Sequence, residues 1–86
     1  MAPGKRKLVR RLQIIEGQVR GLQEMVESGT YCIDVITQTS AVKRALSGVE
    51  DAIMERHLGS CAADQMRRGK SAKATAEILK VYRLKS

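Results

Sequence analysis

The sequence has 86 residues, which suits one small domain but buries too little apolar surface to be stable without help from a second chain or a bound group. Its apolar content comes from Leu, Ile, Val, Met and Ala, with two Tyr, one Pro and no Phe or Trp, and this favours helices over sheets. The net charge is +7, and the scarcity of aromatic residues argues against single-strand binding by base stacking. No apolar run approaches the roughly 20 residues of a membrane span or forms a secretory signal, so we expect one all-α cytoplasmic domain over residues 1–86, with reduced cysteines.

The first predicted element is an amphipathic helix from Lys5 to about Glu27. Ser28-Gly29 ends it, because glycine readily adopts the left-handed conformation found at helix ends. Apolar residues recur along this helix at alternating intervals of four and three residues, which is a heptad-like stripe: Leu8, Leu12, Ile15, Val19, Leu22 and Val26.

The second predicted element is one long helix from about Tyr31 to Met66, and a shorter third helix follows from Ser71. The long helix must extend beyond its hairpin partner, which favours a helix bundle completed by a second subunit. Its stripe again alternates intervals of three and four, and steps of four residues continue it to His57 and Cys61: Cys32, Val35, Thr39, Val42, Leu46, Val49 and Ile53.

The charge is unevenly distributed along the chain. Residues 1–20 carry six Lys or Arg against one Glu (+5), residues 21–63 carry three against six acids (−3), and residues 64–86 carry seven against two (+5). If the two basic ends fold together, they form a positive surface suited to phosphate backbones or anionic lipid. The simpler alternative is that these side chains only solubilise helix faces.

Three potential metal ligands share the long helix: Cys32, His57 and Cys61. The last two are four residues apart and can hold one ion together, whereas 25 helical residues place Cys32 roughly 37 Å from His57. An antiparallel second copy would supply its own Cys32 and form two identical sites. Two thiolates and one imidazole suit Cu(I), since structural zinc normally has a fourth protein ligand. The alternative to metal binding is that each cysteine is a small buried apolar residue and that the histidine is solvated. The sequence contains no catalytic motif, so we do not expect an enzyme.

The segment RLQIIEGQVRGLQEMVESGTYCIDVITQTSAVKRAL and the later ERHLGSC stretch resemble the copper-sensitive operon repressor (CsoR) family, which also includes nickel, formaldehyde and persulfide sensors. The resemblance covers nearly the whole chain. It implies an all-α homodimer with an antiparallel four-helix core, paired into a tetramer that binds operator DNA without a helix-turn-helix motif. It also implies Cu(I) bound by Cys32 of one subunit with His57 and Cys61 of the other.

The resemblance assigns further roles. Tyr31 and Glu77 would form an outer shell around the metal, with the carboxylate linked to the second nitrogen of His57, as is usual for a metal-bound imidazole. Position 48, basic in some relatives, is Gly48 here. The basic residues that match the DNA-contacting positions of the family are Arg11, Arg20, Lys43 and Arg44.

The function we expect is a repressor that binds double-stranded operator DNA when metal-free and dissociates when it binds Cu(I), so that copper-resistance genes are expressed. Its partners are the operator and further copies of the chain, as a homodimer or homotetramer, and no membrane. One alternative in the same fold is a persulfide or thiol sensor that uses Cys32 and Cys61; nickel sensing would need more nitrogen and oxygen ligands. A copper carrier without DNA and a small membrane-binding helical protein are the alternatives from other classes.

Overall fold

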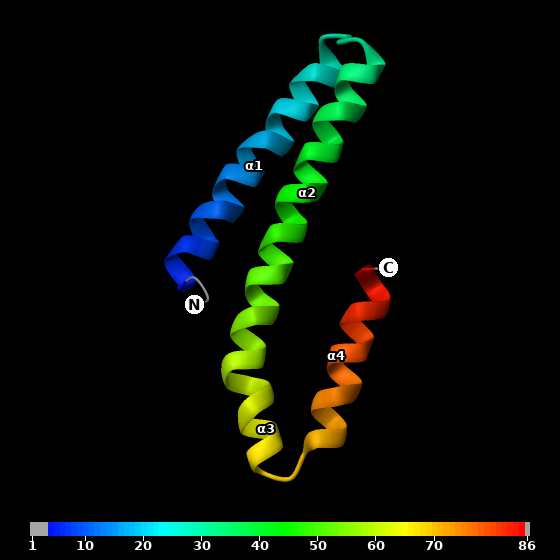
Figure 1. The fold of residues 1–86 in the computed structure, drawn as a ribbon. Helices are drawn as coiled ribbons and strands as arrows, with labels where there is room; N and C mark the ends of the chain where they lie inside the picture. The colour runs from blue at the N-terminus through cyan, green and yellow to red at the C-terminus, as the bar shows by residue number, and fades with distance from the viewer. Residues whose placement is uncertain (1–3, 86) are drawn as a thin grey trace. The chain divides into compact units, whose positions relative to one another are not determined.

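The computed structural model describes residues 4–85, and over that range the regular structure is entirely helical, with no strand (Figure 1). The segments are α1 (Lys5–Glu27), α2 (Cys32–Arg56), the π-helical η1 (His57–Ala62), α3 (Ala63–Arg67) and α4 (Ser71–Lys85). Because α2, η1 and α3 follow one another without a break, the chain has the three predicted helices. The all-α prediction is confirmed.

The chain divides into two compact units, Met1–Ile53 and Met54–Ser86. The first contains α1 and most of α2, and the second contains the end of α2 with η1, α3 and α4. Residues 1–3 and 86 lie outside the described part of the chain, so the predicted single domain over residues 1–86 stays a prediction.

The turn between α1 and α2 is a Schellman motif. The backbone N–H of Thr30 donates to the Met25 carbonyl (2.9 Å) and that of Gly29 donates to Val26 (3.2 Å). Gly29 has φ 73°, the left-handed conformation that its position at the end of α1 predicted. The predicted bounds of the first helix are confirmed.

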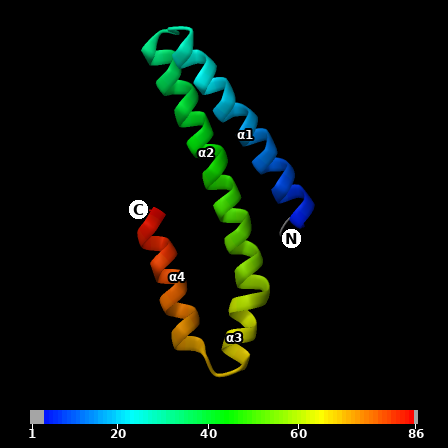
Figure 2. The same ribbon diagram turned by 180° about the vertical axis from the view of Figure 1, so that it is seen from behind.

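In the first unit, α1 and α2 lie antiparallel and side by side (Figures 1 and 2). Only half of each predicted stripe faces the other helix. The inward residues recur every seven positions, and they are Leu8, Ile15 and Leu22 on α1 with Val42 and Val49 on α2. Val35, seven residues before Val42, is half-buried and lines a groove beside them. Ala45 and Ala52 complete this packing.

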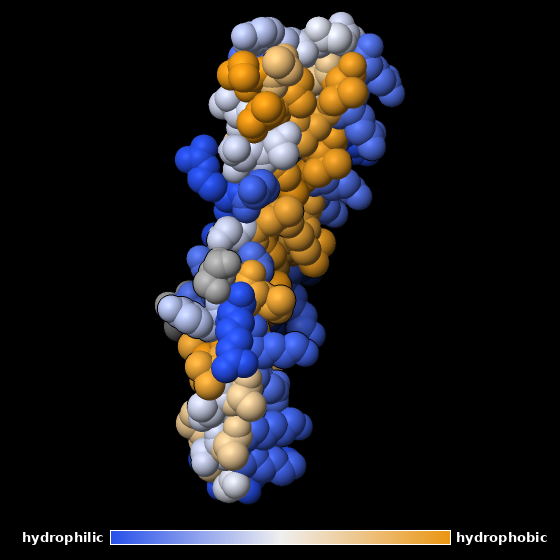
Figure 3. All heavy atoms as spheres, turned by 90° about the vertical axis from the view of Figure 1, so that its right-hand side faces the viewer, coloured by the Kyte–Doolittle hydropathy of each residue, from blue (hydrophilic) through white to orange (hydrophobic). Residues whose placement is uncertain are grey.

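The other half of each stripe remains exposed. We call this set the exposed seam: Leu12, Val19 and Val26 on α1, with Cys32, Thr39, Leu46 and Ile53 on α2. Members of both helices line one open groove on this side, because Val19 and Val26 share it with Thr39. In Figure 3 apolar side chains gather in a band along the part of the surface that the hairpin forms. The α1–α2 hairpin therefore buries only half of its apolar residues, and the exposed half forms an apolar surface of the kind that marks an interaction site.

The predicted long helix over Tyr31–Met66 is confirmed as one continuous helix, in which residues 57–62 are π-helical. Gly59 is a poor α-helix former, and the Ser60 hydroxyl donates to the Arg56 carbonyl (2.8 Å), which offers that carbonyl a side-chain partner. Both features weaken the regular α-helical bonding here. In the second unit Ala62 is 1% and Ala74 is 0% exposed, so small residues form its core.

Candidate metal centre and DNA-facing residues

His57 opens the π-helical segment and Cys61 lies near its end. A π-helical turn, closed by hydrogen bonds five residues apart, is slightly longer than four residues, and an α-helical turn of 3.6 residues is slightly shorter. Residues four apart therefore share one face in either geometry. His57 is half-buried and Cys61 is an exposed free thiol, so the face that carries both is open to a metal ion.

Within the same segment, the Ser60 hydroxyl lies near both a backbone carbonyl and the Cys61 thiol. Its Oγ lies 2.8 Å from the Arg56 carbonyl oxygen and 3.8 Å from Cys61 Sγ. A hydroxyl has one hydrogen to donate, and the shorter bond to the carbonyl takes it. A metal-bound thiolate would be a stronger acceptor than the thiol and would compete for the same hydrogen.

Cys32 is the first residue of α2, an exposed free thiol and the N-terminal member of the exposed seam on that helix. The helix that it begins has 25 residues and is roughly 37 Å long, and His57 comes directly after its last residue. Within residues 4–85 no three His, Cys, Asp or Glu side chains of one chain come together as a metal site. The three predicted donors are therefore not assembled by one chain.

The two predicted outer-shell residues are placed differently. Tyr31 precedes α2 and is 68% exposed, while its backbone carbonyl accepts the N–H groups of Asp34 and Val35. Glu77 is half-buried on α4, and its Oε1 accepts a hydrogen bond from Gln65 Nε2 at 3.1 Å. Over the described residues no hydrogen bond joins His57 to Glu77, so that link stays a prediction.

Sequence analysis did not identify Gln65. The signal for it was present, because Gln65 lies four residues after Cys61 and continues the steps of four that run through His57. Nothing in the pattern indicated that its amide would bond to α4. Its Oε1 is buried and has no hydrogen-bond partner among the described atoms.

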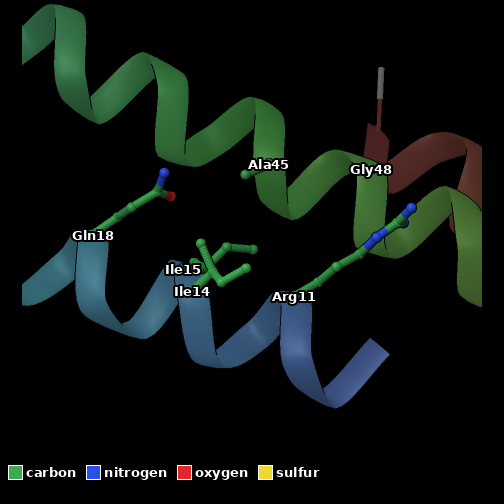
Figure 4. A pocket seen from close by; sticks show the side chains of 6 residues that line it. All are labelled: Arg11, Ile14, Ile15, Gln18, Ala45 and Gly48. Atoms are coloured by element: carbon green, nitrogen blue, oxygen red, sulfur yellow. The ribbon is translucent and has the colours of Figure 1, made fainter. Parts of the chain in front are cut away.

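The predicted DNA-contacting residues all lie in the first unit, and each is exposed: Arg11, Arg20, Lys43 and Arg44. Arg11 lines an open pocket of about 380 Å³ between α1 and α2, with the Gln18 amide at the opposite end (Figure 4). Ile14 and Ile15 lie between these two polar side chains, and the Arg11 side chain extends toward Gly48. Whether these cations touch DNA stays a prediction.

None of the helices within residues 4–85 is both long enough and apolar enough to cross a membrane. This agrees with the absence of a long apolar run in the sequence.

Comparison with known proteins identifies relatives over nearly the full chain. Residues 4–83 match the family model described as metal-sensitive transcriptional repressor. The copper-sensing transcriptional repressor CsoR of Bacillus subtilis is 42% identical over 92% of this chain and 78% of its own length. The copper-sensing transcriptional repressor RicR of Mycobacterium tuberculosis is 40% identical over 92% of this chain and 88% of its own length.

Solved structures give the same result. The crystal structure of the copper-sensing repressor CsoR with Cu(I) from Geobacillus thermodenitrificans superposes with a TM-score of 0.85 at 38% identity, over 98% of this chain and 91% of that one. The nickel-responsive transcriptional regulator InrS superposes with a TM-score of 0.78 at 32% identity, over 93% and 90%. The resemblance found in the sequence is confirmed, as is the expectation of a regulator rather than an enzyme. This chain belongs to the family of metal-sensitive transcriptional repressors.

Proposed function

We propose that the protein is a cytoplasmic Cu(I)-responsive repressor whose homodimer, or pair of dimers, binds double-stranded operator DNA when metal-free and dissociates when Cu(I) binds. The observation that carries this proposal is the separation of the donors. His57 and Cys61 share one π-helical segment, whereas Cys32 opens α2 on the exposed seam. A second copy that covers the seam also supplies the missing thiolate.

The donors fit copper by their chemistry. Two thiols and one imidazole form a soft, low-coordinate set, which Cu(I) prefers. Nickel sensing is the nearest alternative because a nickel-responsive regulator has the same fold, but nickel favours nitrogen and oxygen ligands and this chain has a single histidine. The relatives named as copper-sensing repressors support the same choice.

The exposed seam supports the dimer. Its apolar members, such as Leu46 at 41% exposure, gain most when a matching surface covers them. In the proposed dimer, Cys32 of one subunit lies opposite Gly59 of the other, because Gly59 is midway between His57 and Cys61. The two-fold axis of that antiparallel pair then passes at Ala45–Leu46, and the exposed Leu46 meets its own copy.

Regulation requires that Cu(I) bind the DNA-free conformation more tightly than the DNA-bound one. The coupling is reciprocal, so operator DNA weakens Cu(I) binding by the same factor. The exposed cations of α1 and α2 supply the electrostatic attraction to phosphates. Gly48 contributes no charge, and Arg11 reaches along the pocket toward that position.

The test is fluorescence anisotropy of labelled operator DNA under anaerobic reducing conditions, titrated with protein and then with Cu(I). Operator binding that is lost on addition of one Cu(I) per subunit supports the proposal. Binding that persists with saturating Cu(I), or equal binding to anionic vesicles, contradicts it. In a chain with Cys32 and Cys61 replaced by alanine, the Leu46→Cys variant tests the dimer separately, because the proposed register predicts an intersubunit disulfide on mild oxidation whereas an Ile14→Cys control should stay reduced.

A thiol-sensing repressor is the second candidate, because Cys32 and Cys61 are both free and exposed. In the proposed dimer they come from different subunits and would join through a disulfide or polysulfide after reaction with sulfane sulfur. Intact-protein mass spectrometry after polysulfide treatment distinguishes the two functions. A covalent dimer that also releases the operator, with no release by Cu(I), would favour thiol sensing.

A further inference from the structure

The hydrogen bond from Gln65 Nε2 to Glu77 Oε1 joins α3 to α4 at 3.1 Å in a partly buried position. It connects residues 12 positions apart, across the turn between the two helices. A hydrogen bond to a charged acceptor is stronger than one between neutral groups, and partial burial shields it from water. This contact therefore fixes the position of the Glu77 side chain relative to α3.

Gln65 is also held by its backbone. Its carbonyl accepts the N–H of Lys70 at 2.7 Å, and the N–H of Gly69 donates to Met66 at 3.1 Å. These two bonds form a Schellman motif, with Gly69 at φ 78°. One residue thus closes the turn with its main chain and binds α4 with its side chain, so movement of α3 is transmitted to Glu77.

The bond leaves the carboxylate able to act on a second group. An ionised carboxylate has two oxygens and about four acceptor positions, and an amide donor occupies one of them without cancelling the negative charge. Metal-bound histidines commonly donate their second N–H to a carboxylate, which is itself held by further hydrogen bonds. Gln65 lies four residues after Cys61 and eight after His57, on the helix that carries both donors.

We propose that Gln65 is a positioning residue that holds the Glu77 carboxylate and thereby couples the copper site in η1 to α4. The inference rests on the proposed function, and it assigns to Gln65 a part that is separate from metal binding. Gln65 contacts neither copper nor DNA in this role. Its Oε1 is buried without a hydrogen-bond partner among the described atoms, while its Nε2 bonds to Glu77.

The experiment compares Gln65→Met, Glu77→Met and the double variant, in full-length protein. Methionine keeps the length of either side chain and removes its hydrogen bonding. Lys73→Met, an exposed position on α4, is the matched control. The measured quantity is the coupling factor, which is the ratio of operator dissociation constants with and without saturating Cu(I); values of about 5 to 150 are typical of regulated proteins.

We expect each single substitution to lower the coupling factor by about fivefold or more, and the double variant to lower it no further than Glu77→Met alone, because the two residues act as one unit. Lys73→Met should leave it unchanged. In metal-free protein, hydrogen exchange of the α4 amides should be about tenfold faster in Gln65→Met than in the wild type. If Gln65→Met does not fold, Gln65→Glu replaces it, since an ionised carboxylate cannot donate to Glu77 and repels it.

The outcomes separate the two proposals. A wild-type protein that keeps the operator in saturating Cu(I) overturns the proposed function and the coupling together. A wild-type protein that releases the operator while Gln65→Met behaves identically overturns the role of Gln65 alone. Additive losses in the double variant, or unchanged α4 exchange in Gln65→Met, also overturn it, because the residue would then act by a route other than Glu77.

Discussion

The two compact units of the chain carry different parts of the proposed function. Residues 1–53 hold the exposed seam and all four candidate DNA-contacting cations, whereas residues 54–86 hold His57, Cys61 and the Gln65–Glu77 bond. Of the three proposed copper donors, Cys32 alone belongs to the first unit. The first unit has long apolar stripes and an open side that a partner can cover, and the second has a core of small residues and two of the proposed copper donors. In the proposed function, metal sensing and DNA binding would thus use different parts of one short chain, and Cys32 would belong to both.

The largest effect should come from Cys32→Ala. The variant loses one thiolate of each site, so the coupling factor between Cu(I) and operator DNA should fall from its wild-type value, of the order of 5 to 150, to about 1. Anisotropy titrations with and without Cu(I) measure it, and operator binding by the metal-free variant confirms that the fold is intact. Thr39→Ala, seven residues further along the same seam, is the matched control and should respond normally. Normal release by Cys32→Ala would mean that the donor set is wrong.

Leu46→Glu should weaken the proposed homodimer, whose interface the first unit provides. Each buried leucine contributes about 1.5 to 3 kcal/mol, and two glutamates facing each other at the proposed two-fold axis add repulsion. The dissociation constant of the dimer should rise about 100-fold or more, as measured by sedimentation equilibrium. Ile14→Glu is the control: Ile14 is equally apolar but lines the pocket of Arg11 rather than the seam groove. Equal weakening by both variants would mean that the seam is not the specific interface.

A third test concerns which unit contacts DNA. Replacing Lys43 and Arg44 with alanine should weaken binding to operator and unrelated DNA alike and lower the slope of log affinity against log salt by about 1 to 2. The corresponding change at Lys73 and Lys80, in the second unit, should leave the salt slope unchanged. A larger change in salt slope on replacing Lys73 and Lys80 would mean that the DNA-binding surface lies in residues 54–86.

The two helical hairpins can be compared through their turns, since both are Schellman motifs with a glycine in the left-handed region. Gly29 and Gly69 have φ values of 73° and 78°, a conformation that costs an L-residue about 1 to 2 kcal/mol. Gly29→Ala and Gly69→Ala should each lower the free energy of unfolding by about that amount in urea titrations. If only Gly29→Ala does so, the second unit unfolds outside the cooperative transition of the first.

The smallest expected effect has the opposite sign. Gly48 lies within α2 and a Cβ built on it would meet nothing within 4 Å, so Gly48→Ala should stabilise the protein by about 0.5 to 1 kcal/mol. Urea unfolding at fixed protein concentration measures the gain. A loss of stability would indicate that another subunit packs closely against this position.

The helices could be predicted from the sequence because their signals are local. The apolar residues at alternating intervals of four and three, from Leu8 to Val26, predicted the amphipathic helix α1, and Gly29 predicted where it ends. The same spacing could not show which half of each stripe would face the other helix, because alternate members of a heptad are equally apolar. That distinction required the packed hairpin.

The candidate site was predictable in its residue types but not in its environment. The spacing of His57 and Cys61 places them on one face by periodicity alone, but it does not record the π-helical geometry of that segment or the bond from the Ser60 hydroxyl to the Arg56 carbonyl. The pairing of Gln65 with Glu77 depends on how the turn at Gly69 aligns α3 with α4. Contacts between helices arise from such tertiary details, and a single sequence indicates them only weakly.

The uninterrupted α2 has a genetic consequence if the two subunits share each site. A chain with Cys32 replaced retains His57 and Cys61, and a chain with His57 and Cys61 replaced retains Cys32. Neither homodimer can assemble a complete donor set, but a mixed dimer of the two restores one of its two sites. Two defective alleles expressed together should therefore complement each other. Cells that express both variants should respond to copper, whereas cells that express either variant alone should not.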